Sequence, residues 1–240
     1  MPAQPAFALV VAVLVAANLL NNRVAPAAYP VTGVITAAIL VVIAHAAGLG
    51  WRGLGLGRGT AGPGLRWALL AFGIVAVCYA GLYALGAALP WTRGFLLDQR
   101  VVGAGPGQVA YQVLLRIPLG TVLLEEVAFR GVLYGLLLRE RGAVTATVGS
   151  SVLFGLWHVL PALALLPSHP MLRDRLVGAG GFGPVVVVAV VVGAVLATAL
   201  GGAVFCELRR LSGSLLAPIG LHYAFNGLGF LAAALVTARH

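Results

Sequence analysis

The sequence predicts an all-α membrane protein, a polytopic bundle of seven to eight transmembrane helices that forms one integral membrane domain over residues 1–240. The first observation is composition, because 61% of the 240 residues are hydrophobic and only 9% are charged. An ordinary soluble domain has about 25% charged residues. The second is a mean hydropathy of +1.04, carried by several long apolar runs. Such a chain has too few polar groups to cover a soluble globule, and a disordered chain needs the opposite composition.

The apolar runs divide the chain into seven segments. Each can supply the roughly 20 residues that cross a hydrocarbon core of about 30 Å. Continuous runs of this length predict helices, because barrel strands alternate polar and apolar residues over about ten positions. The segments are 6–22, 31–49, 66–89, 109–138, 143–165, 183–207 and 213–237.

The stretches between these segments predict loops, of which the three longest are 51–64, 90–107 and 167–183. The first segment has no basic residue ahead of it and six apolar segments after it. This pattern favours a retained helix over a cleaved signal peptide. Placing the N-terminus inside puts seven arginines in inner loops and six outside, so the positive-inside rule favours that orientation only weakly.

The chain is basic, with 15 basic and 6 acidic residues and a formal net charge of +9. Every basic residue is an arginine, and most of the arginines stand singly or in pairs at the ends of apolar runs. This placement is typical of anchors that face lipid headgroups. Membrane lipids are therefore expected partners, and nucleic acid is not.

The fourth segment contains three charged side chains that lipid rejects: Glu125, Glu126 and Arg130. Insertion scales give a cost of about 8–10 kcal/mol for three such charges, so we expect them to face the bundle interior. Glu126 and Arg130 are i,i+4 and can form an ion pair on one helix face; a purely structural pair is the alternative interpretation. Glu125 is offset by about 100° and has no evident local partner, so its carboxylate is suited to accept a proton.

Two later segments contribute nitrogen-bearing side chains. The fifth contains His158, and the seventh contains His222 and Asn226, which are i,i+4 on one helix face. With Glu125 as base, one His can orient a water while His222 and Asn226 hold a developing oxyanion. Alternatively, Glu125, His158 and His222 are suitable ligands for zinc or another divalent metal with an open position for water. Both interpretations are consistent with the spacing.

The predicted topology places the two histidines at different depths. Segments five and seven cross the membrane in the same direction, and His158 lies about five residues, or about 7 Å, further from the start of its segment than His222. Either an error in the segment boundaries or a partly buried stretch over 212–220 would remove this difference.

Three motifs, in order along the chain, resemble those of the CAAX protease and bacteriocin-processing (CPBP, or Abi) family of intramembrane endopeptidases, which includes type II CAAX prenyl proteases. They are Glu125-Glu126-x-x-x-Arg130, Phe154-x-x-x-His158 and His222-x-x-x-Asn226. The similarity covers about residues 105–230. Each motif alone is a weak signal. The specificity comes from finding all three, in this order, in three different apolar segments.

The resemblance implies about eight helices and hydrolysis of a peptide bond within or beside the membrane. It implies that Glu125 is the catalytic base and that His158 helps to activate the water. It also implies that His222 and Asn226 stabilise the oxyanion, with Glu126 and Arg130 supporting the site. The family is described both as metal-dependent and as using a metal-free glutamate mechanism, so the metalloprotease assignment stays open.

The expected substrate is a membrane-associated, hydrophobic or C-terminally lipidated peptide or protein. The absence of lysine and the bias toward Ala, Gly and Arg suggest a GC-rich bacterial genome. This predicts a multi-pass protein of the bacterial plasma membrane and argues against a prenylated substrate. Two other function classes are alternatives. A non-catalytic membrane partner or immunity protein would use the polar cluster for recognition, and an ion-coupled transporter would use it as a relay but lacks the expected internal repeat.

Overall fold

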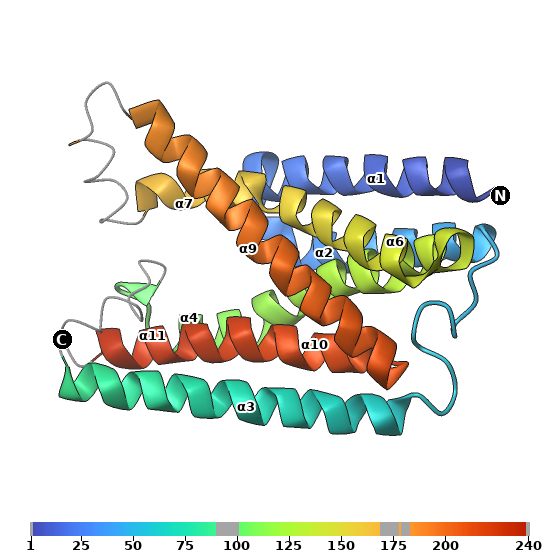
Figure 1. Cartoon of the computed structure of the whole chain (residues 1–240). Helices are drawn as coiled ribbons and strands as arrows, with labels where there is room; N and C mark the ends of the chain where they lie inside the picture. The colour runs from blue at the N-terminus through green and yellow to red at the C-terminus, as the bar shows by residue number, and fades with distance from the viewer. Residues whose placement is uncertain (1, 90–100, 169–177, 179–182, 239–240) are drawn as a thin grey trace.

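A computed structural model describes residues 2–89, 101–168, 178 and 183–238. This part of the chain forms helices and turns and contains no strand, so the predicted all-α fold class is confirmed. Figure 1 shows the helices running back and forth side by side, with the N-terminus at one end of the bundle and the C-terminus at the other. An odd number of passes gives this arrangement.

The first three passes match the predicted segments within a few residues. Gly48 follows the second pass with φ +80° and begins the connecting loop, a backbone conformation that glycine adopts without steric cost. The third pass begins five residues earlier than predicted. The elements are α1 (Ala3–Leu19), η1 (Leu20–Val24), η2 (Pro26–Ala28), α2 (Tyr29–Ala46) and α3 (Ala61–Ala88).

The fourth pass is a long helix with unusual winding. Two stretches form wide π turns, which are rare and often found at functional sites. Pro118 lies inside the first of them, where its missing N–H and its ring prevent regular α-helical hydrogen bonding. The consecutive elements are α4 (Pro106–Tyr111), η5 (Gln112–Val122), α5 (Leu123–Glu125), η6 (Glu126–Leu133) and α6 (Tyr134–Trp157), and the last of these continues into the fifth pass.

The chain reverses direction at Gly142, which has φ +80° inside α6. Contacts on the two sides of this turn pair antiparallel: a Cβ on Gly149 would lie 2.8 Å from Leu137, and Ser150 donates a hydrogen bond to the Phe129 carbonyl at 2.7 Å. Length and composition identify six candidate spans in the described residues, one of which covers 106–164. Because that span is a hairpin, the described chain makes seven passes, in agreement with the seven predicted segments.

The last passes cross the bundle obliquely and then return. Figure 1 shows α9 crossing at a steep angle to the helix made by α10 and α11. The predicted loops 90–107 and 167–183 lie largely outside the described residues. The elements are α7 (Val159–Ser168), α9 (Gly183–Ser212), α10 (Leu216–Tyr223), η8 (Ala224–Leu228) and α11 (Gly229–Thr237).

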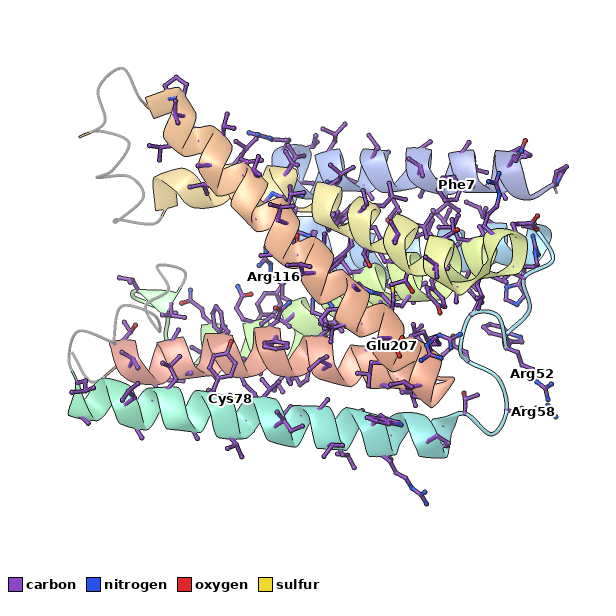
Figure 2. All side chains as sticks on the ribbon, in the orientation of Figure 1. Phe7, Arg52, Arg58, Cys78, Arg116 and Glu207 are labelled. Carbon is purple, nitrogen blue, oxygen red and sulfur yellow. The ribbon has the colours of Figure 1, made fainter. Side chains whose placement is uncertain are left out.

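The outer surface of the bundle is apolar along its length. Val77 on α3 and Leu200 on α9 are both more than 70% exposed, and only 6% of the most apolar window of α9 is buried. Such exposure is compatible with lipid and unfavourable in water. Figure 2 shows Arg52 and Arg58 projecting beyond the loop at one end, where a headgroup region would lie. The chain is therefore a multi-pass membrane protein.

A buried turn precedes α10. Ser212, Ser214 and Leu215 are each at most 6% exposed, and the Leu215 N–H donates to the Gly55 carbonyl at 2.8 Å. The turn therefore lies inside the protein, and the expectation of a partly buried stretch over 212–220 is confirmed.

Candidate active site

The two acids and the arginine of the fourth pass lie in the bundle interior. Glu125, Glu126 and Arg130 are 3%, 0% and 0% exposed. Arg130 donates from Nη1 to Glu126 Oε1 at 3.0 Å, so the predicted ion pair is confirmed. The other oxygen, Glu126 Oε2, has no hydrogen-bond partner among the described residues. The insertion cost of these charges is thus only partly offset by their direct pairing.

Aromatic rings surround the part of Arg130 that carries no hydrogen bond. Its Nε and Nη2 have no partner among the described residues, yet its guanidinium carbon lies 3.9 Å from the Phe154 ring centre and 4.7 Å from that of Phe205. A cation over an aromatic face is attracted by the ring quadrupole, most strongly when water is excluded. The Arg130 guanidinium is therefore stabilised by Glu126 on one side and by rings from α6 and α9 on the other.

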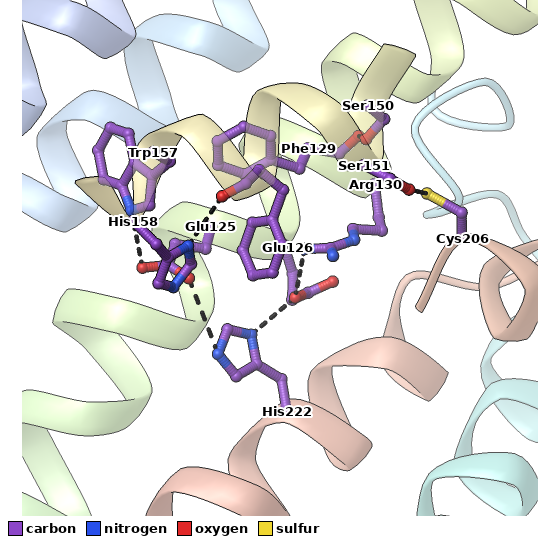
Figure 3. A network of polar contacts seen from close by, with 11 residues as sticks. Glu125, Glu126, Phe129, Arg130, Ser150, Ser151, Trp157, His158, Cys206 and His222 are labelled. Carbon is purple, nitrogen blue, oxygen red and sulfur yellow. Dashed lines mark hydrogen bonds and ion pairs between the residues drawn. The ribbon is translucent and has the colours of Figure 1, made fainter. Parts of the chain in front are cut away.

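His222 connects the two adjacent acids. Its Nδ1 lies 2.7 Å from Glu126 Oε1 and makes a hydrogen bond, and its Nε2 lies 3.8 Å from Glu125 Oε2. Its ring stacks against Phe205, with centroids 5.2 Å apart. Figure 3 shows the imidazole reaching from α10 to the two carboxylates. The seventh pass is thereby joined to the fourth through a buried polar contact.

The two carboxylate oxygens of Glu125 differ in their hydrogen bonding. The buried Trp157 indole donates from Nε1 to Glu125 Oε1 at 3.0 Å, as Figure 3 also shows. Glu125 Oε2 has no hydrogen-bond partner among the described residues. The sequence motifs did not predict a role for Trp157. Its signal was present, because a Trp N–H in an apolar run needs an acceptor and Glu125 had no evident partner.

His158 lies at the end of α6, directly after Trp157. Its Nδ1 makes a hydrogen bond with the Phe154 carbonyl at 2.8 Å, which leaves Nε2 as its outward polar atom. The rings of His158 and His222 both contact Phe154, with centroid distances of 4.6 Å and 6.2 Å. The structure therefore brings the three motif segments together around Phe154, although His158 makes no hydrogen bond to Glu125 within the described part of the chain.

Asn226 lies on η8, about one wide turn beyond His222. It is half-buried, and its side chain makes no hydrogen bond to another described residue. The bonded network thus contains Glu125, Glu126, Arg130 and His222 but not Asn226. Its role in holding an oxyanion stays a prediction.

The site has few free donor atoms for a metal centre. A catalytic zinc site usually supplies three protein ligands and leaves one position for water. His222 Nε2 and Glu125 Oε2 are two free donor atoms near one point. Across the described ranges, no group of three His, Cys, Asp or Glu side chains is placed to hold a metal ion. This geometry does not fit a three-ligand centre.

Comparisons with known proteins agree with the motif-bearing region. A family model described as type II CAAX prenyl endopeptidase Rce1-like matches residues 107–228, about half of the chain. The match contains all three motif segments and the hairpin at Gly142. No curated protein and no solved structure matches the chain.

Proposed function

The chain belongs to the Rce1-like type II CAAX prenyl endopeptidase family, whose members are membrane proteases, and from this premise we propose that it cleaves its substrate with a water activated by Glu125. The observation that carries the proposal is the asymmetry of this carboxylate. Trp157 holds Oε1 at 3.0 Å, while Oε2 is buried, lacks a partner among the described residues and lies 3.8 Å from His222 Nε2. A water between these atoms has a base on one side and an imidazole on the other.

The proposed reaction has two proton transfers. Glu125 Oε2 takes a proton from water as the water oxygen bonds to the peptide carbonyl carbon, which forms a tetrahedral oxyanion. The C–N bond then breaks, and Glu125 returns the proton to the leaving nitrogen. The products are a new carboxylic acid and a new amine, and at neutral pH the proton of the acid passes to the amine to give carboxylate and ammonium. No step passes through a metal.

His222 is suited to stabilise the oxyanion from Nε2. Glu126 accepts the hydrogen bond from Nδ1 at 2.7 Å and is itself paired with Arg130. With a proton on each nitrogen, His222 donates from Nδ1 to Glu126 and keeps an Nε2–H donor. An Nε2–H donor aimed at the reacting carbonyl then supplies preorganised stabilisation.

His158 and Asn226 complete the proposed set. His158 Nε2 is free of the bond that holds Nδ1 to the Phe154 carbonyl, so it is available to orient the water. Asn226 has two amide donors that are not used by another described residue, and a bound substrate would give them an acceptor. Both roles follow the family resemblance and rest on position rather than on an existing contact.

The proposed substrate is a peptide or protein that reaches the site from the membrane, with a hydrophobic or C-terminally lipidated segment. We place the protein in the plasma membrane of a bacterium, with its N-terminus inside, on the composition and arginine distribution of the sequence. Lipids are its surroundings, and nucleic acid is not an expected partner.

The decisive variant is Glu125→Gln. Glutamine keeps the volume and can still accept the Trp157 hydrogen bond, but it cannot take a proton from water. Cells expressing wild type or Glu125→Gln at matched membrane levels are compared by mass spectrometry of membrane-protein terminal peptides. We expect new termini with wild type and none with the variant.

The matched control is Glu207→Gln, which changes an acid whose side chain is 47% exposed and lies outside the bonded network. It should give the wild-type termini. Identical termini from wild type and Glu125→Gln would contradict the proposed mechanism and favour a non-catalytic membrane partner.

A further inference from the structure

The junction between α6 and α7 lies beside the candidate active site and interrupts the helical hydrogen bonding. In an α-helix, the carbonyl of each residue accepts from the N–H four positions later. The residue four positions after Trp157 is Pro161, which has no N–H. The carbonyl of Trp157 therefore cannot receive this hydrogen bond, and a buried carbonyl needs another partner.

Side chains supply hydrogen bonds at this junction. The N–H of His158 donates to the Gly155 carbonyl at 3.0 Å, one residue nearer than in the α-helical pattern. The imidazole Nδ1 of His158 makes a hydrogen bond with the Phe154 carbonyl at 2.8 Å. The Trp157 carbonyl accepts a hydrogen bond from Asn18 Nδ2 at 3.0 Å. Asn18 therefore provides the donor that Pro161 cannot.

Asn18 belongs to the first pass, far from the motif-bearing segments in the sequence. It lies on α1, well inside the candidate span Gln4–Val24, where a polar side chain is costly unless it meets a partner. Figure 1 shows the end of α1 beside the junction of α6 and α7. Asn18 lies outside residues 107–228, which the family model matches. A segment beyond the family match thus contacts the backbone of Trp157.

The Asn18 amide is held in the orientation that this hydrogen bond requires. A carbonyl can only accept, so the amide must turn Nδ2 toward Trp157 and Oδ1 away from it. Asn22 Nδ2 donates to Asn18 Oδ1 at 2.6 Å and to the Asn18 carbonyl at 2.9 Å. Asn22 lies on η1, directly after α1. Its two hydrogen bonds therefore fix the amide of Asn18 as a donor toward Trp157.

The residue that receives this hydrogen bond also holds the proposed base. Trp157 is 5% exposed, and its indole Nε1 donates to Glu125 Oε1 at 3.0 Å, as Figure 3 shows. Its ring also packs against Phe129, with ring centroids 5.9 Å apart. Because the backbone of Trp157 determines where its indole begins, two hydrogen bonds through this residue connect Asn18 to Glu125.

We propose that Asn18 is a positioning residue for cleavage, which fixes the Trp157 backbone and thereby the indole that orients Glu125. This inference rests on the proposed endopeptidase function. Without the Asn18 amide, the Trp157 carbonyl loses this donor, and the end of α6 is free to shift relative to the fourth pass. A misplacement of about 1 Å can lower the rate of an enzyme by about 100-fold.

The first test compares wild type with Asn18→Leu, which keeps a similar volume and removes the amide. The purified full-length protein in liposomes cleaves a synthetic peptide that spans a bond cut in wild-type membranes. We expect kcat to fall about 10-fold with KM within about 2-fold of wild type. In a Trp157→Phe background the same substitution should cost less than about 3-fold, because its effect passes through the indole. An unchanged kcat, or losses that multiply independently, would overturn the proposal.

The second test does not depend on cleavage. The protein is labelled with ¹⁵N in the indoles of its four tryptophans and studied by NMR in detergent micelles, where Trp157→Phe identifies the Trp157 signal. An indole N–H that is bonded to a carboxylate resonates downfield and exchanges slowly with water. We expect Asn18→Leu to move the Trp157 signal upfield and to speed its exchange. An unchanged signal would overturn the proposal even if activity falls.

The matched control is Thr32→Val, at the same end of the first pass. Thr32 donates from Oγ1 to Asn21 Oδ1, a hydrogen bond between the first and second passes that does not involve Trp157. Its loss should lower stability and leave both kcat and the Trp157 signal unchanged. If Asn18→Leu does not fold, Asn22→Ala removes the group that orients Asn18 and should shift the Trp157 signal less, in the same direction. No shift there would also overturn the proposal.

The two proposals can fail separately. If Glu125→Gln cleaves the peptide as fast as wild type, the proposed function fails, and a positioning role in cleavage fails with it. If Glu125→Gln is inactive and Asn18→Leu matches wild type in kcat and in the Trp157 signal, only the role of Asn18 is contradicted.

Discussion

Arg130 and Arg209 are both buried arginines on membrane-spanning helices, with 0% and 6% exposure, but they serve different purposes. Arg130 pairs with a carboxylate and lies between aromatic rings. Arg209 donates from Nη2 to the Gly53 carbonyl at 3.1 Å, next to Gly55, where φ +79° and the arginine itself leave no room for a side chain. Arg130 belongs to a buried cluster of charged side chains, whereas Arg209 connects the loop around Gly53 to α9.

The difference shows what a buried charge requires. The partner of Arg130 is ionised, so loss of either one leaves the other as an uncompensated charge inside the protein. The partner of Arg209 is a neutral carbonyl, so loss of the arginine costs a hydrogen bond and some packing. We therefore expect substitutions around Arg130 to lower both stability and cleavage, and substitutions around Arg209 to lower stability alone.

The largest expected effect is that of Glu126→Ala. It leaves Arg130 without its counter-ion and His222 Nδ1 without its acceptor, which should lower the free energy of unfolding by about 3–5 kcal/mol and abolish cleavage. Denaturant unfolding in detergent micelles measures the first, and the terminal-peptide assay the second. The exposed control Glu207→Ala should match wild type, and equal stability of both variants would contradict the assigned importance of the buried pair.

An intermediate effect is expected for Arg209→Met. The Gly53 carbonyl then loses its donor, which should lower the free energy of unfolding by about 1–3 kcal/mol. Cleavage per folded molecule should stay within about 3-fold of wild type, because Arg209 does not contact Glu125 or His222. Activity lost at matched folded levels would show that the loop around Gly53 belongs to the site, and would remove the contrast between the two arginines.

The smallest expected stability change belongs to Trp157→Phe. It removes one hydrogen bond to Glu125 Oε1, worth about 1 kcal/mol of unfolding free energy. As a positioning residue, Trp157 should affect kcat by about 10-fold with KM unchanged, because the carboxylate loses its fixed orientation. A change in KM alone would instead indicate that the indole contacts substrate.

Much of the fold followed from hydropathy. All seven apolar segments appear as passes, because twenty apolar residues in lipid have no alternative to a helix. The hairpin between segments four and five was visible as a short polar break around Arg139 and Arg141. The resemblance implied about eight helices, and the described residues make seven passes.

The site was predicted in part, and the gaps have physical reasons. The Glu126–Arg130 pair follows from local spacing, which sequence alone displays. The Trp157 contact and the rings over Arg130 depend on how three helices meet, which no local pattern records. Asn226 shares a motif with His222 but lies outside the bonded network, since a spacing of four residues places two side chains near one helix face without fixing which groups they contact.

The wide turns of η5 also affect how this chain is compared with other sequences. Each π turn takes up about one more residue than an α turn for the same rotation. The number of residues between a position and Glu125 therefore does not by itself tell which side of the helix that position occupies. A relative with one residue deleted between Gln112 and Val122 could place its equivalent of Arg116 one position nearer and keep it on the same face. Residues before Glu125 should therefore be aligned with those of relatives by the side of the helix that they occupy. An alignment gap between Gln112 and Val122 indicates a change in helix winding.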